Sequence, residues 1–304
     1  MVKLKLDFPP HFFDEETRNG YAIPRKTKEL WAVMLDLLAE LDRVCKKHNL
    51  SYFVNGGTLI GAVRHHGFIP WDDDLDVIMP RKDYDKLMEI GPKEFRNPYF
   101  LQNKYSEPNA PCFFAKIRNS NTTAFNYDEL YSIMDYNKGV FIDIFPLDVV
   151  PSDPEEDKLF REEIKKKREI VIKKGRSVGI FSDTKSKRKR IIKYIISKLL
   201  YYNRKKNLPD FLKEFKEFEE LCSRYKNIKT GFLADVVYDP DCTRFDAYDF
   251  GDKIYLDFEF IKVPVIKGYH HHLTKLFGNY MKPVIYESHN SFYDTDKSYI
   301  NYIK

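Results

Sequence analysis

An acidic cluster at the start of an apolar run constrains the fold of this chain more than any other feature. The segment WDDDLDVIM, residues 71–79, places four aspartates between a tryptophan and a short apolar run. Carboxylates this close repel one another, so the cluster is costly unless positive charge lies among them. The apolar run is typical of a buried strand. Since residues i and i+2 of a strand share one face, we expect Asp74 and Asp76 to point the same way. Leu75 and Val77 then point into the core.

Two carboxylates on one face of a strand are ligands for a hard cation such as Mg²⁺ or Mn²⁺, which would bind phosphate oxygens with its remaining positions. A third carboxylate is predicted from GVFIDIF, residues 139–145, where Asp143 lies between two isoleucines. A buried carboxylate satisfied by hydrogen bonds is the alternative for Asp143. A solvated acidic turn is disfavoured by the apolar strand that follows directly. A calcium loop fails at Val77, where glycine is needed, and at Asp83, where a bidentate glutamate is needed.

A pair of glycines lies upstream of the acidic strand, between a short β-type run and a short helix. Gly56 and Gly57 let the backbone approach a phosphate closely, and a helix N-terminus favours negative charge. Thr58 adds a hydroxyl to this predicted phosphate site. Taken alone, a Gly-Gly pair is equally typical of a tight turn.

Four basic residues are candidate ligands of phosphates or of an acidic acceptor. Arg64 and His65 lie on the same short connection as the glycines. Lys116 and Arg118 are two residues apart in the predicted strand FAKIR, so we expect them to share a face. An ordinary surface role is the alternative for His65.

The remaining pattern alternates between helices and strands. Apolar residues recur at helical spacing from Thr27, the expected N-cap, to Leu50. The expected elements up to Pro146 and Pro151, which should close this block, are helices at 27–50, 58–67 and 82–91 and strands at 51–55, 74–79, 99–102, 112–118, 122–126 and 139–145. Beyond them we expect a helical region over 154–227 with an amphipathic stretch at 190–202, strands near 232–237 and 254–265, and a helix through 269–281.

The net charge of +5 is distributed unevenly along the chain. Residues 161–206 contain 18 Lys and Arg against 4 Asp and Glu, so the remainder of the chain is net acidic. Such a basic helical region indicates a polyanionic partner, with a solvated face as the plain alternative. The run KSKRKR beside an apolar helical stripe favours contact with an anionic membrane. No nucleic acid is expected.

The sequence favours a cytoplasmic location. It has no apolar run of about 20 residues to span a bilayer and no secretory signal pattern at its start. Its four cysteines lie far apart and are expected to be free thiols; they are Cys45, Cys112, Cys222 and Cys242. Peripheral contact with the inner membrane face through residues 161–206 is compatible with this location.

Glycines at a strand end, a short helix, an Asp-x-Asp strand and a later third aspartate together resemble the nucleotidyltransferase fold, the superfamily of DNA polymerase beta. More specifically, NGGTLIGAVRHHGFIPWDDDLDVIMPR resembles the signature of the LicD family of phosphotransferases. This family includes bacterial cholinephosphotransferases of lipopolysaccharide and teichoic acid and, more distantly, the fukutin-related proteins. Further support comes from RNGYAIPRKTKELWAVMLDLL, MPRKDYDKL and GVFIDIFPLD. The resemblance covers residues 17–150 closely and 254–283 loosely, where Phe277-Gly278 replaces the usual Tyr-Gly turn.

The resemblance implies an α+β fold, with a nucleotidyltransferase-like mixed sheet flanked by helices. We expect a catalytic core over residues 1–150. A basic helical insertion over 151–230 and a C-terminal part over 231–304, which completes the catalytic domain, should follow.

The resemblance also implies an activity, namely metal-dependent transfer of a phosphorylated alcohol, typically phosphocholine. The donor would be a CDP-activated alcohol, the acceptor a sugar hydroxyl of a surface glycan precursor or lipid-linked glycan, and CMP would leave. Carried over to this sequence, Asp74 and Asp76 would hold Mg²⁺ on the diphosphate, and Asp143 would position or deprotonate the acceptor hydroxyl. Gly56, Gly57 and Thr58 would hold phosphate groups.

Three other functions remain open from the sequence. A glycosyltransferase could use its Asp-x-Asp to bind a nucleotide sugar through Mn²⁺, although such enzymes usually begin with a βαβ unit. A relative of the fold could transfer a nucleoside monophosphate, so that the nucleotide ends on the acceptor. A non-enzymatic adaptor for membrane or nucleic acid would bind polyanions whether or not Asp76 is intact.

Overall fold

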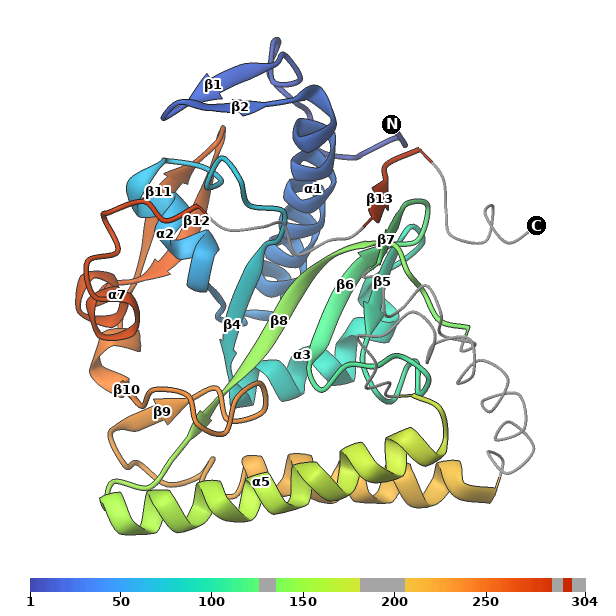
Figure 1. Ribbon diagram of the computed structural model, residues 1–304, viewed down its shortest axis with the longest axis vertical. Helices are drawn as coiled ribbons and strands as arrows, with labels where there is room; N and C mark the ends of the chain where they lie inside the picture. Colours follow the sequence, from blue (N-terminus) through green and yellow to red (C-terminus); the bar gives the residue numbers. More distant parts are fainter. Residues whose placement is uncertain (126–134, 181–205, 286–291, 297–304) are drawn as a thin grey trace.

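A seven-stranded mixed sheet forms the centre of the molecule in the computed structural model, which describes residues 1–125, 135–180, 206–285 and 292–296 (Figure 1). Strand β4 pairs in parallel with β8, and the other pairs in this sheet are antiparallel. The α+β class expected from the sequence is therefore confirmed. The strands, in order across the sheet, are β3 (Phe53–Val54), β4 (Asp76–Pro80), β8 (Val140–Val149), β6 (Ala115–Asn119) and β5 (Tyr99–Gln102), with β9 (Phe232–Ala234) and β10 (Phe245–Asp246) beside the far end of β8.

Strand β8 is longer than the sequence predicts. The expected strand ends before Pro146, but β8 continues through this proline to Val149. On the side away from β4, β8 pairs with β6 as far as Ile144 and with β9 from Asp148. Pro146 falls between these two partners, so its missing N–H removes no bond of either ladder. The prediction that Pro146 closes the block was wrong for this reason.

The two faces of the sheet have different neighbours. Helices α1 (Arg25–His48) and α3 (Arg81–Glu94) share one large core with the face to which Val77 and Ile144 point. Alternate residues of the same strands point to the opposite face, because side chains alternate along a strand. That opposite face carries the polar residues discussed below.

Helix α1 begins earlier than expected. Its N-cap is Pro24, which has extended backbone angles and makes no side-chain cap bond, and Arg25 is the first helical residue. The predicted N-cap Thr27 therefore lies inside the helix. At the other end, Asn49 adopts the left-handed conformation and its N–H bonds to the last turn, which ends the helix where the sequence predicts.

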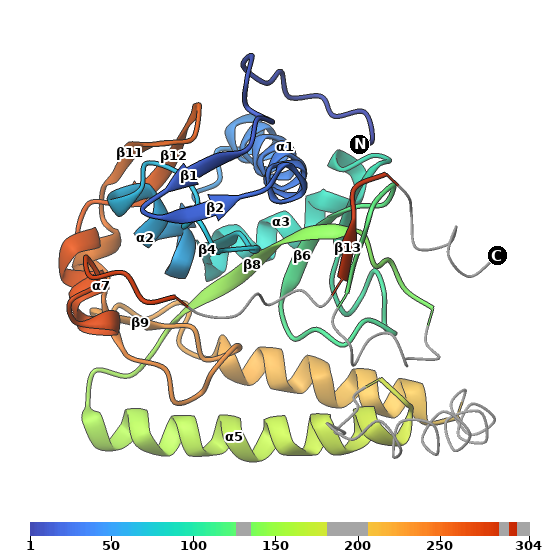
Figure 2. The same cartoon turned by 45° about the horizontal axis from the view of Figure 1, so that its top comes forward.

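A second core lies between α5 (Pro154–Ser177) and the helical residues 206–222, which run side by side in Figures 1 and 2. Helix α5 is capped by Asp153, whose side chain accepts a hydrogen bond from the Glu156 N–H at 2.9 Å. Two lysines of α5, Lys167 and Lys174, pair with Glu214 of the neighbouring helix, at 2.5 Å and 2.7 Å. Part of the charge of the basic region is thus neutralised within the fold. The predicted amphipathic stretch 190–202 lies outside the described residues.

Smaller elements complete the chain. They are β1 (Glu16–Arg18), β2 (Tyr21–Ile23), α2 (Gly56–Arg64), β7 (Thr123–Phe125), the 3-10 helix η1 (Ala247–Phe250), β11 (Lys253–Phe258), β12 (Ile261–Ile266), α7 (Tyr269–Phe277) and β13 (Phe292–Asp294). The strand signal over 254–265 corresponds to the hairpin β11–β12, which turns at Glu259 with a φ of 55°. In the described part of the chain, no helix combines the length and apolar character needed to cross a membrane.

Candidate active site

Three charged side chains form a row across three adjacent strands. Asp76 at the start of β4 lies opposite Asp143 of β8 in the parallel register. Lys116 of β6 lies opposite Asp143 from the other side, in the antiparallel register. The Lys116 Nζ donates to Asp143 Oδ1 at 2.5 Å. We call Asp76, Asp143 and Lys116 the charged row.

Backbone contacts fix the start of β4 within the site. The Asp143 N–H donates to the Leu75 carbonyl at 2.9 Å, and the Asp76 N–H donates to Thr58 Oγ1 at 2.9 Å. Thr58 is buried, so its hydroxyl supports the backbone of Asp76 at the base of the predicted phosphate site. Asp74 lies just before the strand rather than within it.

The charged row lies in a cavity of about 710 Å³. One wall is helix α2, one is the sheet, and one is the segment that follows α7. The lining residues are Gly57, Ile60, Arg64, Ile69, Asp74, Asp76, Phe114, Lys116, Phe141, Asp143, Phe145, Tyr238, Phe277, Asn279, Tyr280, Lys282 and Val284.

The N-terminus of α2 lies next to the charged row. Gly56 has a φ of 54°, a conformation that favours glycine, and a Cβ at this position would lie 3.5 Å from Asp76 Oδ2. Gly57 lines the cavity directly. Bare backbone and helix N-terminus therefore lie beside the carboxylates, as an anionic ligand requires.

The carboxylates of the cavity lie close enough to influence one another. Burial raises the pKa of Asp76 well above its ordinary value, and the charges of Asp74 and Asp143 raise it further. Burial also raises the pKa of Asp143, while Lys116 acts in the opposite direction. The oxygen atoms of Asp74, Asp76 and Asp143 have the chemistry that Mg²⁺ or Mn²⁺ prefers. They do not all lie within 4.8 Å of one another in the structure, so a divalent cation would have to draw them closer together.

Two of the four predicted basic ligands line the cavity. Lys116 belongs to the charged row, and Arg64 lies on the α2 wall. The Arg64 Nη1 donates to the carbonyl of Tyr280 at 2.5 Å and to that of Lys282 at 3.4 Å. Arg64 thus connects α2 to the segment that closes the cavity.

The other two predicted basic ligands do not line the cavity. Arg118 is buried, and its guanidinium donates to Gln102 Oε1 at 2.6 Å and to the Gly139 carbonyl at 2.7 Å. His65 contacts Arg64 and Asn19. Burial and the charge of Arg64 lower the pKa of His65 to about 4.

Sequence reasoning missed the far wall of the cavity. Tyr238 follows β9, and Asn279, Tyr280 and Lys282 follow α7. These residues are separated from Asp143 by some 95 to 140 positions, and no pattern of spacing connects them to it. The loose resemblance over residues 254–283 and the Gly278 turn after α7, with a φ of 60°, mark this segment without pointing to those side chains.

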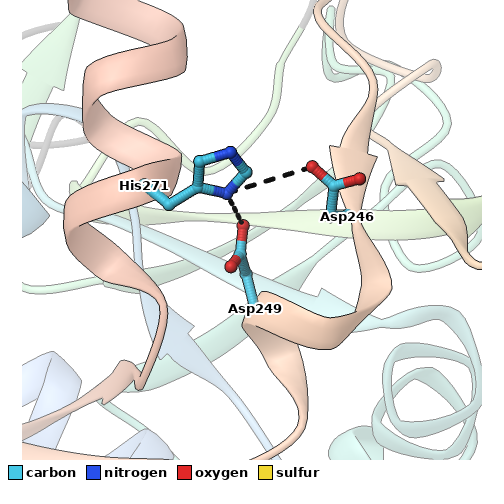
Figure 3. A group of neighbouring side chains, drawn as sticks. All are labelled: Asp246, Asp249 and His271. Atoms are coloured by element: carbon cyan, nitrogen blue, oxygen red, sulfur yellow. Dashed lines mark hydrogen bonds and ion pairs between the residues drawn. The ribbon is translucent and has the colours of Figure 1, made fainter.

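A second group with metal-ligand chemistry lies outside the cavity, where α7 meets η1 (Figure 3). Among the described residues, Asp246, Asp249 and His271 are the one trio whose ligand atoms all lie within 4.8 Å of one another. His271 Nδ1 is 2.8 Å from Asp249 Oδ2, and Lys275 Nζ is 3.0 Å from Asp246 Oδ2. Because Lys275 already pairs with Asp246, we interpret this group as an ionic clamp that holds α7 in place.

Comparison with known proteins identifies related sequences. Residues 49–175 match the model of the family described as LicD/FKTN/FKRP, nucleotidyltransferase domain. The chain is 29% identical over 269 residues to the lipopolysaccharide cholinephosphotransferase LicD of Haemophilus influenzae, an alignment that covers 84% of this chain and 91% of that protein. An uncharacterised protein of Rickettsia prowazekii is 29% identical over 138 residues, which is 44% of this chain and 50% of that protein.

The family match and the geometry concern the same residues. All three members of the charged row, together with Gly56 and Gly57 of α2, fall inside the matched segment. The long alignment also reaches well beyond that segment. The matched domain and the long alignment together support a LicD family member that is an enzyme of that family.

Proposed function

We propose that this protein transfers phosphocholine from CDP-choline to a sugar hydroxyl of a lipopolysaccharide-type glycan, with release of CMP. The observation that carries the proposal is the charged row, which lies beside the N-terminus of α2 in a cavity large enough for a nucleotide. Similarity to a lipopolysaccharide cholinephosphotransferase supports the choice of phosphocholine and of the acceptor class.

In the proposed reaction, the acceptor oxygen attacks the phosphorus that carries choline. The new bond joins this phosphorus to the sugar oxygen, and the bond to the CMP oxygen breaks. Asp143 accepts the hydroxyl proton, while Lys116 holds the Asp143 carboxylate in place through its 2.5 Å contact. The backbone at Gly57 and the Arg64 guanidinium line the cavity, where they can bind the diphosphate oxygens.

A divalent cation would be held by Asp74 and Asp76, with Asp143 nearby. When bound, it neutralises the charge on the diphosphate and on the leaving CMP. The protein's own contribution is to position the acceptor and to supply the fixed charges of the cavity.

A binding panel followed by a transfer assay tests the proposal. With Mg²⁺ present, CDP-choline at 100 times its dissociation constant should stabilise the wild-type protein by about 2.7 kcal/mol, and UDP-glucose and GDP-mannose should not. Incubation with CDP-choline and a choline-free lipo-oligosaccharide should release CMP and add phosphocholine to the glycan, measured by chromatography and mass spectrometry.

Two variants test whether transfer depends on the carboxylates of the cavity. Asp76→Asn should lower transfer by about a hundredfold or more, because it removes a cavity carboxylate. Asp14→Asn, an exposed substitution outside the cavity, should leave transfer unchanged. Stabilisation by nucleotide sugars alone would indicate a glycosyltransferase, and CMP covalently attached to the acceptor would indicate nucleotidyl transfer. Either result would overturn the proposal.

We also propose that the basic region, residues 161–206, brings the enzyme to an anionic membrane surface where a lipid-linked acceptor resides. Support comes from its composition of 18 basic and 4 acidic residues. Part of this positive charge is neutralised by ion pairs between α5 and residues 206–222. Flotation with anionic liposomes at low salt tests the idea. Equal binding after charge reversal of the basic residues in 185–190, or no binding at all, would remove it.

A further inference from the structure

Three aromatic rings line one side of the cavity, next to the charged row. Phe145 follows Asp143 by two residues in β8, so its ring lies on the same sheet face as the charges, and Phe114, in the bend just before β6, lines the same cavity. Tyr238, from the segment after β9, packs against both of them. We call Phe114, Phe145 and Tyr238 the aromatic wall.

The rings of the aromatic wall pack at steep angles to one another. The centroids of Phe114 and Phe145 are 4.3 Å apart, and that of Tyr238 lies 5.2 Å from Phe145 and 5.9 Å from Phe114, in both cases with a T-shaped arrangement. Phe145 is buried, whereas Tyr238 is 56% exposed. The wall is therefore a fixed apolar surface that presents the Tyr238 ring at the cavity.

Positive charge already lies against aromatic rings in this cavity. The Lys116 Nζ is 3.7 Å from the centroid of Phe141 and 5.4 Å from that of Phe114. Tyr238 also lies in a negative field: partial burial raises the pKa of its hydroxyl, and the charges of Asp76 and Asp235 raise it further. An electron-rich ring in a negative field attracts a cation.

We propose that the aromatic wall binds the quaternary ammonium of the transferred phosphocholine and selects choline over uncharged alcohols. This inference rests on the proposed function. A quaternary ammonium has no N–H to donate, so ring faces and nearby carboxylates are the partners that suit it. The hydroxyls of glycerol or ribitol would lose hydrogen bonds to water against Phe114 and Phe145, which offer none in return.

The spacing of the two rows fits this group. Residues i and i+2 of a strand are roughly 6.6 Å apart, and this is the step along β8 from Asp143 to Phe145. The two-carbon linker of phosphocholine spans a somewhat shorter distance from phosphorus to nitrogen. A phosphorus bound beside Asp143 would therefore bring the ammonium towards Phe145, against which Tyr238 packs.

The experiment compares CDP-choline with CDP-3,3-dimethylbutanol, in which carbon replaces the charged nitrogen. Both ligands carry the same cytidine, diphosphate and shape, so the ratio of their dissociation constants isolates the positive charge. Calorimetry with Mg²⁺ should show wild-type protein binding CDP-choline at least about tenfold more tightly, which corresponds to about 1.4 kcal/mol. CDP-glycerol and CDP-ribitol should bind more weakly than CDP-choline as well.

Three variants define the contribution of the ring. Tyr238→Leu should reduce the tenfold ratio to about twofold or less, with the affinity for CMP unchanged. Tyr238→Phe retains the ring face and should retain the ratio. Tyr248→Leu is the matched control, because Tyr248 is 91% exposed and does not line the cavity.

The outcomes separate this inference from the proposed function. Equal affinities of the wild type for CDP-choline and CDP-3,3-dimethylbutanol would overturn the inference. It would also be overturned if Tyr238→Leu weakened the binding of CDP-choline, CDP-3,3-dimethylbutanol and CMP equally, because the ring would then stack on cytosine. If the affinity ratios are as expected but no glycan accepts phosphocholine, the aromatic wall binds the ammonium and the proposed transfer function is wrong. If the enzyme transfers phosphocholine but Tyr238→Leu leaves the affinity ratio unchanged, the proposed function holds and the role of the aromatic wall is wrong.

Discussion

Asp143 and Lys116 show how single residues resolve the charge problem that the sequence poses. The carboxylate and the ammonium are about 14–15% exposed, so their pairing takes place largely away from water. Lys116 also lies on the Phe141 ring, which limits the positions that its side chain can adopt. The positive charge required by the acidic cluster is thus supplied in part by the neighbouring strand.

Removal of the Lys116 charge should destabilise the fold. We expect Lys116→Met to lower the free energy of unfolding by about 2–3 kcal/mol in EDTA, because it leaves the Asp143 carboxylate without its partner. The double variant with Asp143→Asn should cost less than the sum of the single variants, since the two groups interact. Urea denaturation measures each value.

The control for this prediction is Lys262→Met. Lys262 pairs with Asp257, and both side chains are about two-thirds exposed, so we expect a change within about 0.5 kcal/mol. Additive costs in the double variant would mean that the Lys116–Asp143 contact contributes nothing of its own.

Helix α7 illustrates the element scale, because several contacts converge on its short length. His271 and Lys275 face Asp249 and Asp246, and His272 lies on the buried side, where its Nε2 is 3.3 Å from Asn55 Oδ1. The His272 ring also packs against Phe245, with centroids 4.6 Å apart. The helix therefore contacts β10, η1 and the N-cap residue of α2, Asn55.

His272 should make the stability of the protein fall in acid. Burial and the nearby positive charges of His271 and Lys275 lower its pKa to about 4. A lowered pKa means that the unfolded state binds the proton more tightly, so stability is fully present above the unfolded pKa of about 6.5 and is lost as pH falls towards 4. The loss should reach at most about 3 kcal/mol.

Melting temperatures measured from pH 7 to pH 4 test this expectation. The fall should be shallower in His272→Phe, which has no proton to bind, than in the wild type. His11→Gln, at an exposed position, should follow the wild-type profile. Parallel profiles for the wild type and His272→Phe would contradict the prediction.

Gly268 lies where α7 begins, and any larger residue there should disturb the ionic clamp. A Cβ at Gly268 would lie 2.2 Å from Asp249 Oδ1 and 2.6 Å from its Cβ and Cγ, closer than atoms can pack. We expect Gly268→Ala to lower the free energy of unfolding by about 1–3 kcal/mol. Gly251→Ala is the matched control, since its Cβ would meet only the Tyr248 carbonyl at 3.4 Å. Equal stabilities of the two variants would show that Asp249 moves aside without cost.

Across the whole molecule, β8 connects the two cores. Its first half packs in the core shared with α1, and its end pairs with β9, near the core beneath α5. At this junction Arg81 of α3 binds Asp148 of β8 through two hydrogen bonds of 2.7 Å, and both side chains are buried. The ion pair therefore joins α3 to the end of β8 that lies near the second core.

Loss of this pair should be the most damaging of the changes considered. Asp148→Asn leaves the Arg81 charge buried without its carboxylate, and we expect a cost of about 3–5 kcal/mol in the free energy of unfolding. Asp85→Asn removes a partly exposed carboxylate 3.5 Å from the same guanidinium and should cost less than about 1 kcal/mol. Denaturation that proceeds in two steps in Asp148→Asn would indicate that the cores unfold separately.

Local patterns predicted much of this fold and part of the candidate site. The alternation around Asp76 and the glycines that begin α2 are contained within short segments, so their placement could be inferred from spacing. The pairing of Asp143 with Lys116 depends on strand register, which the sequence does not specify. Arg118 shows what the sequence could not predict. It lies in the same strand as Lys116, but it donates a hydrogen bond to Gln102 of the next strand and does not line the cavity. Pro146 was misread for a similar reason, because its tolerance depends on where β6 and β9 lie.

The bond from Arg64 to the Tyr280 carbonyl has a consequence for synthesis of the protein on the ribosome. The wall that closes the cavity is translated about 200 residues after Asp76, which at 5–20 residues per second is a delay of about 10–40 s. During this interval the nascent chain holds its carboxylates and glycines without the segment that encloses them. Catalytic competence should therefore arise late in translation, well after the central strands have emerged.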